Sequence, residues 1–572
     1  MAELGKRLTI KLGELSGTEA FIWALVAFFG YRWVHMSARY VARLRHVRDI
    51  PSTPTLFFGF EKGPRTGLPH IPWVCPVNAY TPRQPWLKYE RVRSDLIALP
   101  SLLSAHMAYL TASPRLAHIV SQNLDAFRKP TYLGRYTAMN VFGKNLLSAE
   151  DGDEHRRHAT VIKRCFNERS MENVWDAMRR SLATMLTEEV EGLGNDGSVE
   201  DVRETMIRLT LLVIGSAGFG VDFPWTINET TDEDMPFAEA LHMVEKSVML
   251  QLLVPSWIMQ NIPSAKLKRY ALARKCFHAH LYTMYNAKRA ELSADFHTEK
   301  NSRRDIPGDL MGSLVHSQLS VEEETRLEGG DRRLAGLTES EIIGNMCEHR
   351  NAGHETASNT LAFTLGYLAL YPEWQEEVHR EVKAVCESGM PGYGDLQRLP
   401  LCLAVCLEAL RLRDVVVSNF KEATRDFIVP YSTWDEHGII SHHEHVIKQG
   451  SIVVIDQTAA QLNPFTWGSD RLNFNPRRHL AASYARALGF EGSGGRSPFV
   501  GFALGPRQCM GKRFAEVEMT SFISGVCSEY IIEPVRLNAD ESWEEMRTRM
   551  LDDTKEHLTL QPGRFAVRFV RR

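Results

Sequence analysis

Apolar residues recur every three to four positions along most of the chain between residues 96 and 410, which is the spacing of one face of an α-helix. The pattern is clearest in four long segments: residues 172–190, 242–254, 262–292 and 356–385. Pro372 interrupts the last of them, because proline has no amide hydrogen with which to continue a helix. Most of the chain is therefore predicted to be helical.

The pattern changes between residues 414 and 460, where runs rich in Val, Ile and aromatic residues are separated by turn-forming residues. These runs (VVVSNF, FIVPY and SIVVID) predict β-strands. The histidine-rich SHHEH at 441–445 is expected to be a turn rather than a metal site, and the charged segment 320–336 a surface loop. We expect one large domain over residues 60–572, mainly α with a small β-rich part (α+β).

The N-terminus contains an apolar stretch, residues 20–31, without charge between Glu19 and Arg32. Extended to residue 36, it predicts a membrane anchor helix. Arginines follow before the first acid, Asp49, which favours a cytoplasmic location for the rest of the chain. A cleaved signal peptide and a buried core helix are the alternatives. The expected order is an N-terminal tail (1–19), an anchor helix (20–36), a basic flank and hinge (37–59) and the large domain (60–572).

Composition and charge narrow the function classes. The chain has a formal net charge of -3, with 44% hydrophobic and 24% charged residues, as in ordinary globular proteins. This balance gives no reason to expect nucleic-acid binding. The chain has 9 cysteines at irregular spacing, with no Cys-x-x-Cys, which argues against a disulfide framework and against a zinc ribbon. A reducing compartment fits this cysteine usage best.

One cysteine has an unusual context. The stretch GFALGPRQCMGKRF (501–514) is a glycine- and proline-containing loop that leads into a helical pattern, with Arg507 two residues before Cys509. A helix N-terminus and a nearby guanidinium both favour a thiolate. A nucleophile would need a base, and this segment has no His or Asp, so a soluble cysteine hydrolase is a distant alternative. A single thiolate suffices as a metal ligand when a cofactor such as haem supplies the others.

The pattern Phe502-x-x-Gly505-x-Arg507-x-Cys509-x-Gly511 resembles the haem-binding signature of the cytochrome P450 family of haem-thiolate monooxygenases. The resemblance implies a cytochrome P450-like fold in which Cys509 is the axial ligand of the haem iron. It also implies that Phe502 packs beside the sulfur and that Arg507 pairs with a haem propionate. Gly505 and Gly511 would let the backbone and the flat macrocycle approach closely.

A second similarity lies upstream. Glu408-x-x-Arg411, followed by Arg478 in FNPRRH, resembles the structural triad of the family. Glu408 and Arg411 stand three residues apart in a helical pattern, so they share one helix face and can pair. The resemblance implies a scaffold behind the haem and no catalytic role for these residues.

The segment AGHETAS (352–358), inside a long helical pattern, resembles the oxygen-activating motif of the family. The resemblance implies that Gly353 loosens the helix so that a diatomic ligand fits over the iron. Glu355 and Thr356 would then deliver protons to bound oxygen, as a general-acid relay.

The segment 151–166 resembles the family helix that contacts the haem propionates. His155 stands where Trp or His is usual, and the resemblance implies that it pairs with a propionate. The Arg that usually follows four residues later is Ala159 here, and Arg156 or Arg157 is the available substitute at another helix angle.

The sequence departs from the family pattern at several places. CEHRN (347–351) brings charges into a helix that is usually apolar, and Arg413 and Asp414 stand where an apolar residue and prolines are usual. Gln461 occupies a position where His is common. Buried charges are costly unless paired, so these departures keep open a catalytically impaired haem- or lipid-binding membrane protein.

Taken together, the motifs resemble fungal, membrane-anchored members of the family. They imply haem b, O2 and electrons from NADPH–cytochrome P450 reductase, with cytochrome b5 as a further donor, because no flavin or nicotinamide domain is visible. The expected substrate is a hydrophobic small molecule such as a terpenoid or another secondary metabolite, and no nucleic-acid partner is expected. The expected location is the endoplasmic reticulum membrane, with the catalytic domain facing the cytoplasm. A haem-thiolate isomerase or dehydratase, which needs no reductase, is the alternative.

Overall fold

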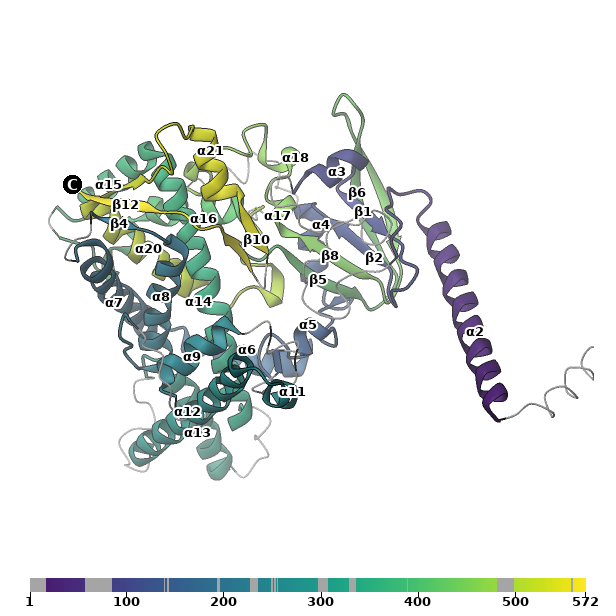
Figure 1. The fold of residues 1–572 in the computed structure, drawn as a ribbon, viewed down its shortest axis with the longest axis horizontal. Coiled ribbons are helices and arrows are strands. Elements are labelled where there is room, and N and C mark those ends of the chain that lie inside the picture. Colours follow the sequence, from purple (N-terminus) through teal and green to yellow (C-terminus); the bar gives the residue numbers. More distant parts are fainter. Residues whose placement is uncertain are drawn as a thin grey trace, which may run out of the picture.

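The computed structural model describes residues 17–56 and 85–572, apart from gaps at 138, 141–142, 193–195, 227–234, 248–249, 251–253, 255, 297–306, 329–335, 388, 481–497 and 557–558. A helical part and a β-rich part lie side by side, and the N-terminal helix extends from the β-rich side (Figure 1). The fold class predicted from the sequence, mainly α with a smaller β part, is confirmed.

Long helices dominate the described part of the chain. They are α2 (Gly17–His46), α4 (Pro114–Gln122), α6 (Asp153–Cys165), α7 (Glu168–Met185), α8 (Val202–Val213), α9 (Phe237–Lys246), α12 (Ala265–Phe296), α13 (Leu310–Glu328), α14 (Glu339–Leu370), α15 (Pro372–Val385), α16 (Pro400–Leu412) and α20 (Lys512–Glu529). Shorter helices are α3 (Leu87–Val92), α5 (Gly134–Thr137), α11 (Ser256–Asn261), α17 (Gln457–Ala460), α18 (Pro464–Trp467) and α21 (Trp543–Arg547). The predicted break at Pro372 is confirmed, because α14 ends at Leu370 and α15 begins at Pro372.

The strands in the described part of the chain form four small sheets. A five-stranded sheet has the order β1 (Leu96–Leu99), β2 (Ala108–Thr111), β8 (Ile452–Asp456), β5 (Ser418–Ala423) and β3 (Phe127–Arg128). The others are the pair β6 (Phe427–Trp434) and β7 (Ile440–Ile447), the trio β4 (Ser198–Val199), β12 (Val567–Arg571) and β9 (Tyr530–Pro534), and the pair β10 (Thr554–Glu556) and β11 (Leu560–Pro562). The parallel pair β2 and β8 is fully buried, which explains the continuous apolar run IVVI.

Two local expectations were wrong. SHHEH (441–445) is part of strand β7 and pairs with β6, rather than forming a turn. The first part of the charged segment 320–336 continues helix α13 to Glu328. In both places the polar side chains lie on exposed faces of regular structure, so high polarity did not indicate a loop.

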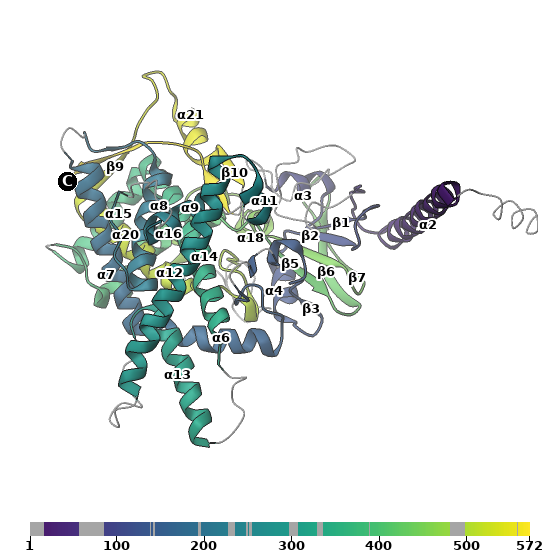
Figure 2. The same ribbon diagram turned by 60° about the horizontal axis from the view of Figure 1, so that its bottom comes forward.

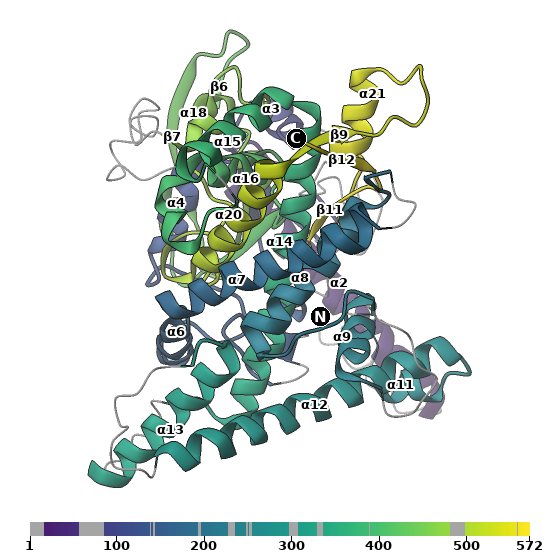
Figure 3. The same ribbon diagram turned by 90° about the vertical axis from the view of Figure 1, so that its left-hand side faces the viewer.

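The core is built around α14. From Ala357 to Leu370 the helix is buried, and Leu361, Phe363, Leu365 and Leu368 belong to the same apolar cluster as residues of α7, α8, α16 and α20. In Figure 2, α14 runs through the middle of the helical part and α6 crosses near its lower end. A second apolar cluster joins the first turns of α14 to α9, α12 and α13, and α12 and α13 run along one edge of the molecule (Figure 3).

The N-terminal apolar segment is helical, but the membrane anchor predicted over residues 20–36 is not supported. Within the described part of the chain, no helix is both long enough and apolar enough to cross a bilayer. The uncharged run ends at Arg32, and helix α2 continues from there with Arg39, Arg43 and Arg45 between apolar residues. The C-terminal turns of α2 are tied to the large domain: Arg43 donates to the carbonyl oxygens of Ser101 and Ser104 at 2.7 and 2.9 Å.

Candidate functional site

The Cys509 loop folds into one tight conformation before α20 begins. The Cys509 amide donates to the carbonyl oxygen of Phe502 at 2.9 Å. Ala503 and Gly505 both have positive φ, at 56° and 71°. A Cβ on Gly505 would lie 2.4 Å from the Ser121 carbonyl oxygen, because the loop packs directly on the last turn of α4. Only glycine accommodates both the positive φ and this close backbone approach.

The Cys509 residue is exposed, yet surrounding protein desolvates its thiol. Burial raises the pKa of Cys509, while the Gly511 amide and Lys512 lower it less strongly. The sequence predicts a lowered pKa, because the helix N-terminus and the nearby cation can be identified in it and the desolvation of the thiol cannot. A bound metal cation would reverse the direction, since a coordinating thiol is deprotonated.

The residues around this thiol fit a haem. A Cβ on Gly511 would meet only the Cys509 Sγ, at the ordinary contact distance of 4.0 Å, so the space beside Gly511 and the sulfur is open. Phe502 is half-buried and contacts Phe499 edge-on, with ring centroids 6.2 Å apart. Within the described residues, no group of three or more His, Cys, Asp or Glu side chains could hold a metal ion. A lone thiolate therefore suits a metal whose other ligands come from a cofactor.

Arg507 is held in place by protein groups. Its Nε donates to Asp151 Oδ1 at 2.5 Å, Nη1 to the Leu146 carbonyl at 3.0 Å, and Nη2 to the Ala149 carbonyl at 2.5 Å. The other Asp151 oxygen accepts from the Lys129 amide at 2.6 Å. These bonds use three of the five guanidinium N–H groups and leave two for an anionic ligand.

Two cationic or basic groups lie near Arg507. His155 is buried on α6, and burial and Arg507 lower its pKa to about 4. Lys421, on β5, is also buried, and its Nζ has no hydrogen-bond partner in the described part of the chain. Burial lowers the pKa of Lys421, and the Asp151 carboxylate opposes this. An orphaned buried ammonium beside Arg507 fits the negative charge of a haem propionate.

Sequence reasoning missed Asp151 and Lys421. Asp151 is the first residue of the segment that resembles the propionate-binding helix, but it was not singled out there. Lys421 has no sequence signal of its own, because its proximity to Arg507 depends on the pairing of β5 with β3 and β8. Only the tertiary structure brings both residues to the Cys509 loop.

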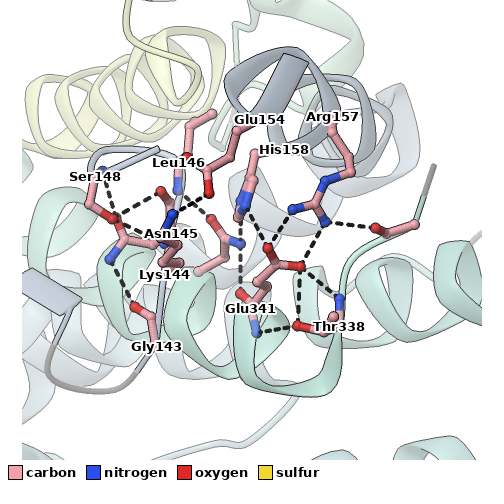
Figure 4. A network of polar contacts seen from close by, with 12 residues as sticks. Gly143, Lys144, Asn145, Leu146, Ser148, Glu154, Arg157, His158, Thr338 and Glu341 are labelled. Carbon is pink, nitrogen blue, oxygen red and sulfur yellow. Dashed lines mark hydrogen bonds and ion pairs between the residues drawn. The ribbon is translucent and has the colours of Figure 1, made fainter. Parts of the chain in front are cut away.

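Both proposed substitutes for the missing arginine at Ala159 are paired with carboxylates of the protein. Arg157 forms a two-pronged ion pair with Glu341 on α14, at 2.7 and 2.5 Å, as Figure 4 shows. Arg156 pairs with the exposed Asp153. Burial raises the pKa of Glu341, but Arg157 and His158 outweigh it and hold that pKa well below its usual range. Arg157 thus fastens α6 to α14 rather than serving an anion beside Cys509.

The motif AGHETAS lies in the middle of α14, on the stretch where the helix is less buried than in its C-terminal half. The Thr356 hydroxyl donates to the Ala352 carbonyl at 2.6 Å. The Glu355 carboxylate accepts from Thr559 at 2.7 Å and from Gln561 at 3.0 Å, both near strand β11. Gly353 has open space, with Ile214 Cδ1 3.7 Å from an added Cβ. The proton-delivery roles of Glu355 and Thr356 stay predictions.

Glu408, Arg411 and Arg478 lie together in the interior. Arg411 donates through Nε and Nη2 to both Glu408 oxygens, and Arg478 Nε lies 3.3 Å from Glu408 Oε1. His479, a residue the sequence did not single out, lies 3.0 Å from Glu408 Oε2. Burial raises the pKa of Glu408, but Arg411 and His479 outweigh it and bring the pKa to about 2. The group links α16 to the segment that follows α18.

Arg413 and Asp414, the two departures that begin the stretch RDVVV (413–417), both have partners. The buried Arg413 pairs with Asp552 and donates to the Leu551 carbonyl at 2.7 Å. Asp414 accepts from the Val416 amide at 3.1 Å and from Gln461 Nε2 at 3.0 Å. Burial raises the pKa of Asp414 to about 8, so a proton removes its charge at neutral pH. Gln461 thus donates a hydrogen bond to Asp414, so these two departures from the family pattern stabilise each other.

The charged stretch CEHRN (347–351) of α14 destabilises the helix less than its sequence suggests. Glu348 and His349 are half-buried, and the side chains of Arg350 and Asn351 lie outside the described residues. His349 packs edge-on against Phe166, with ring centroids 5.8 Å apart, and burial lowers its pKa to about 4. This histidine is therefore neutral at pH 7 and brings no charge into the helix.

Comparisons with known proteins agree with this arrangement. The family model described as Cytochrome P450 matches residues 100–557. Cytochrome P450 monooxygenase 124 of Postia placenta is 28% identical over 484 residues, which cover 84% of this chain and 86% of the relative. The ganoderic acid synthetase of Ganoderma lucidum is 24% identical over 527 residues, or 86% and 90% of the two chains. A crystal structure of a cytochrome P450 has the same fold, with a TM-score of 0.64 and 19% identity over 87% of this chain and 99% of its own.

Proposed function

The chain belongs to the cytochrome P450 family of monooxygenases, and from that premise we propose that it inserts one oxygen atom from O2 into a hydrophobic small molecule at a haem b bound through Cys509. One observation supports this most directly. The Cys509 loop is closed on the Phe502 carbonyl, with Cys509 at the surface of the loop and the positively charged Arg507 fixed two residues away. Haem-thiolate chemistry, when the group is bound, supplies the oxidation.

The chain itself supplies binding, orientation and proton placement. Arg507, Lys421 and His155 would hold the propionates, and the closed loop fixes the direction of the Cys509 sulfur. Thr356 carries a proton at Oγ1 and Glu355 holds its carboxylate toward β11, on the same half-exposed stretch of α14. In these positions both groups can serve as proton donors in the reaction, as general acids do.

We further propose that electrons come from NADPH–cytochrome P450 reductase, with cytochrome b5 as an additional donor. The first turn of α20 offers a basic docking surface, Lys512 and Arg513, next to the thiol-bearing loop. The family likeness to fungal members supports a substrate of the terpenoid or another secondary-metabolite class. We place the protein at the endoplasmic reticulum membrane with the catalytic domain facing the cytoplasm, and the exposed Phe21, Trp23, Phe28 and Phe29 of α2 support a lipid partner.

The carbon monoxide difference spectrum of the dithionite-reduced protein tests the proposed haem ligand. The wild type should show the Soret band of thiolate ligation, and Cys509→Ser should lose it. Cys386→Ser, at a half-buried cysteine outside the loop, should keep it. A wild-type spectrum typical of neutral-thiol or imidazole ligation would overturn the assignment.

Turnover with and without the reductase tests the reaction class. Product should form only when NADPH, the reductase and O2 are all present. Product formed without reductase would support the alternative, a haem-thiolate isomerase or dehydratase. Stoichiometric haem without O2 consumption under any substrate would instead support a non-catalytic haem protein.

A further inference from the structure

Residues 143–149, here named the docking loop, lie directly against the first turns of α14. A Cβ on Gly143 would stand 2.3 Å from the Ser340 carbonyl oxygen, and Gly143 has a φ of 127°. From the other side, a Cβ on Gly344 would stand 2.6 Å from the Lys144 carbonyl oxygen. Glycine on both partners therefore lets two backbones touch. Any larger residue at either position would push the loop away from the helix.

Asn345, the next residue of α14, bonds to the docking loop and is 1% exposed. Its Oδ1 accepts from the Leu146 amide at 2.8 Å, and its Nδ2 donates to the Glu341 carbonyl at 2.6 Å. Because a backbone N–H can only donate, Oδ1 must face Leu146 and Nδ2 must face the other way. The orientation of this side-chain amide is thus determined by an obligatory partner rather than assigned by choice.

The same reasoning gives the tautomer of His158 on α6. Asn345 Nδ2 lies 3.1 Å from His158 Nδ1, so Nδ1 accepts and the ring proton is on Nε2. That proton faces Glu341 Oε1 at 3.3 Å. Figure 4 shows this buried network, in which Arg157 and His158 of α6 meet Glu341 of α14 beside the docking loop. Helix α6, helix α14 and the loop are consequently fixed to one another.

The opposite side of the docking loop holds the arginine beside the thiol. The Leu146 carbonyl accepts from Arg507 Nη1 at 3.0 Å, and the Ala149 carbonyl accepts from Nη2 at 2.5 Å. The same residue, Leu146, therefore bonds to Asn345 through its amide and to Arg507 through its carbonyl. One loop residue joins α14, which carries Glu355 and Thr356, to the segment that carries Cys509.

We propose that Asn345 is a positioning residue for Arg507, acting through Leu146 of the docking loop. It holds the loop carbonyls where they orient the guanidinium, and so orients the two N–H groups left for a haem propionate. Ala159 supplies no cation and Arg157 is paired with Glu341, so the propionate contact depends on Arg507 together with Lys421 and His155. This inference rests on the proposed function, since it requires haem bound at Cys509.

Two variants test the inference by different physical routes. Asn345→Ala removes the bond to Leu146, whereas Gly344→Ala removes no bond but drives a methyl group against the Lys144 carbonyl. Their controls are Gln375→Ala and Gly394→Ala. Gln375 is an equally buried amide bonded to the backbone of Leu368 and Ile532 near the other end of α14, and Gly394 has open space around it.

The readouts are the rate of haem transfer to an excess of a haem-binding apoprotein and the midpoint reduction potential, both measured on the purified full-length protein. Asn345→Ala and Gly344→Ala should lose haem about tenfold faster than the wild type, the factor that a loss of about 1.4 kcal/mol produces. Their potentials should become more negative, because a propionate charge that is less well neutralised favours the ferric state. The two controls should retain wild-type haem-loss rates and potentials.

The decisive comparison is made in an Arg507→Ala background. If Asn345 acts through Arg507, adding Asn345→Ala there should change the haem-loss rate and the potential no further. Equal effects of Asn345→Ala in both backgrounds, or haem loss at the control rate from both loop variants, would overturn the inference alone. A wild type without a thiolate-type carbon monoxide spectrum would instead overturn the proposed function, and this inference with it.

Discussion

Arg411 donates through Nε and Nη2 to both carboxylate oxygens of Glu408, at 2.7 and 2.8 Å, and neither side chain is exposed. Two further Arg411 N–H groups reach the carbonyls of Gln461 and Arg471, each at 2.8 Å. One turn of α16 thereby binds the backbone at residues 461 and 471, in the stretch of chain that precedes the Cys509 loop. The pair is a local motif with a long-range structural effect.

Glu408→Gln should destabilise the protein by about 3–5 kcal/mol, because it leaves the Arg411 charge buried without its counter-ion. The expected result is a large fall in melting temperature or in the yield of folded protein. Glu377→Gln is the control, because its pair with Arg477 at 2.7 Å is solvent-exposed and should matter by only about 0–1 kcal/mol. Equal melting temperatures for both variants would contradict a scaffold role for Glu408.

Glu518→Gln should make the protein less sensitive to alkaline pH. Glu518 is 2% exposed on α20, its Oε2 has no partner among the described residues, and burial raises its pKa to about 8. Between the unfolded pKa of 4.5 and the folded value, the folded state keeps a proton that the unfolded state has released, so stability falls as pH rises.

The glutamine variant lacks this titration. Its melting temperature should equal that of the wild type below about pH 4 and exceed it increasingly up to about pH 8. At pH 8 the difference in the free energy of unfolding should be on the order of 1–4 kcal/mol. Thermal unfolding followed across this pH range provides the measurement. Glu533→Gln, at an exposed carboxyl group, should show no such divergence. A constant difference at every pH would mean that Glu518 is ionised in the folded protein.

Gly505→Ala and Ala503→Gly should have opposite effects on the Cys509 loop. Alanine at 505 combines a φ of 71° with a Cβ 2.4 Å from the Ser121 carbonyl, so the loop must move away from α4. The expected cost is about 1–3 kcal/mol, together with weaker haem retention. Glycine at 503 relieves the positive φ of 56°, so it should be neutral or mildly stabilising. Thermal unfolding and haem content of both variants check the prediction, and a shared sign would refute it.

Thr559→Val should reduce the coupling of electron use to product formation. The Thr559 hydroxyl donates to Glu355 at 2.7 Å and accepts from Asn359 at 3.0 Å, so valine removes one of the two groups that hold the Glu355 carboxylate and leaves the bond from Gln561. We expect product per NADPH to fall about two- to tenfold, less than the roughly hundredfold that a proton-transfer group itself contributes. The measurement is product and peroxide formed per NADPH consumed.

Thr559→Ser should restore the coupling, because it keeps the hydroxyl group. Thr364→Val, on the same helix at a buried hydroxyl that donates to the Thr360 carbonyl, should leave it unchanged. Unaltered coupling in Thr559→Val would show that the bond to Glu355 has no part in proton delivery.

Much of the site was predictable because its signals are local. The pairing of Glu408 with Arg411 follows from helix geometry at a separation of three residues, and the break at Pro372 follows from a missing amide hydrogen. The glycines of the Cys509 loop indicate backbone conformations that other residues rarely adopt. Such features depend on neighbours within one or two turns, so a single sequence contains the information needed to find them.

What the sequence by itself determined is therefore the helical character, the order of the motifs and the thiol that they surround. Only the tertiary structure decided which distant groups meet. Asp151 and Lys421 lie near Arg507, and Arg413 pairs with Asp552. Asp414 accepts a hydrogen bond from Gln461. The physical reason is that the free energy of a buried charge depends on partners and desolvation supplied by segments far away in the chain. That dependence also explains why the direction of the Cys509 pKa shift and the consequences of the RDVVV departure could not be predicted in advance.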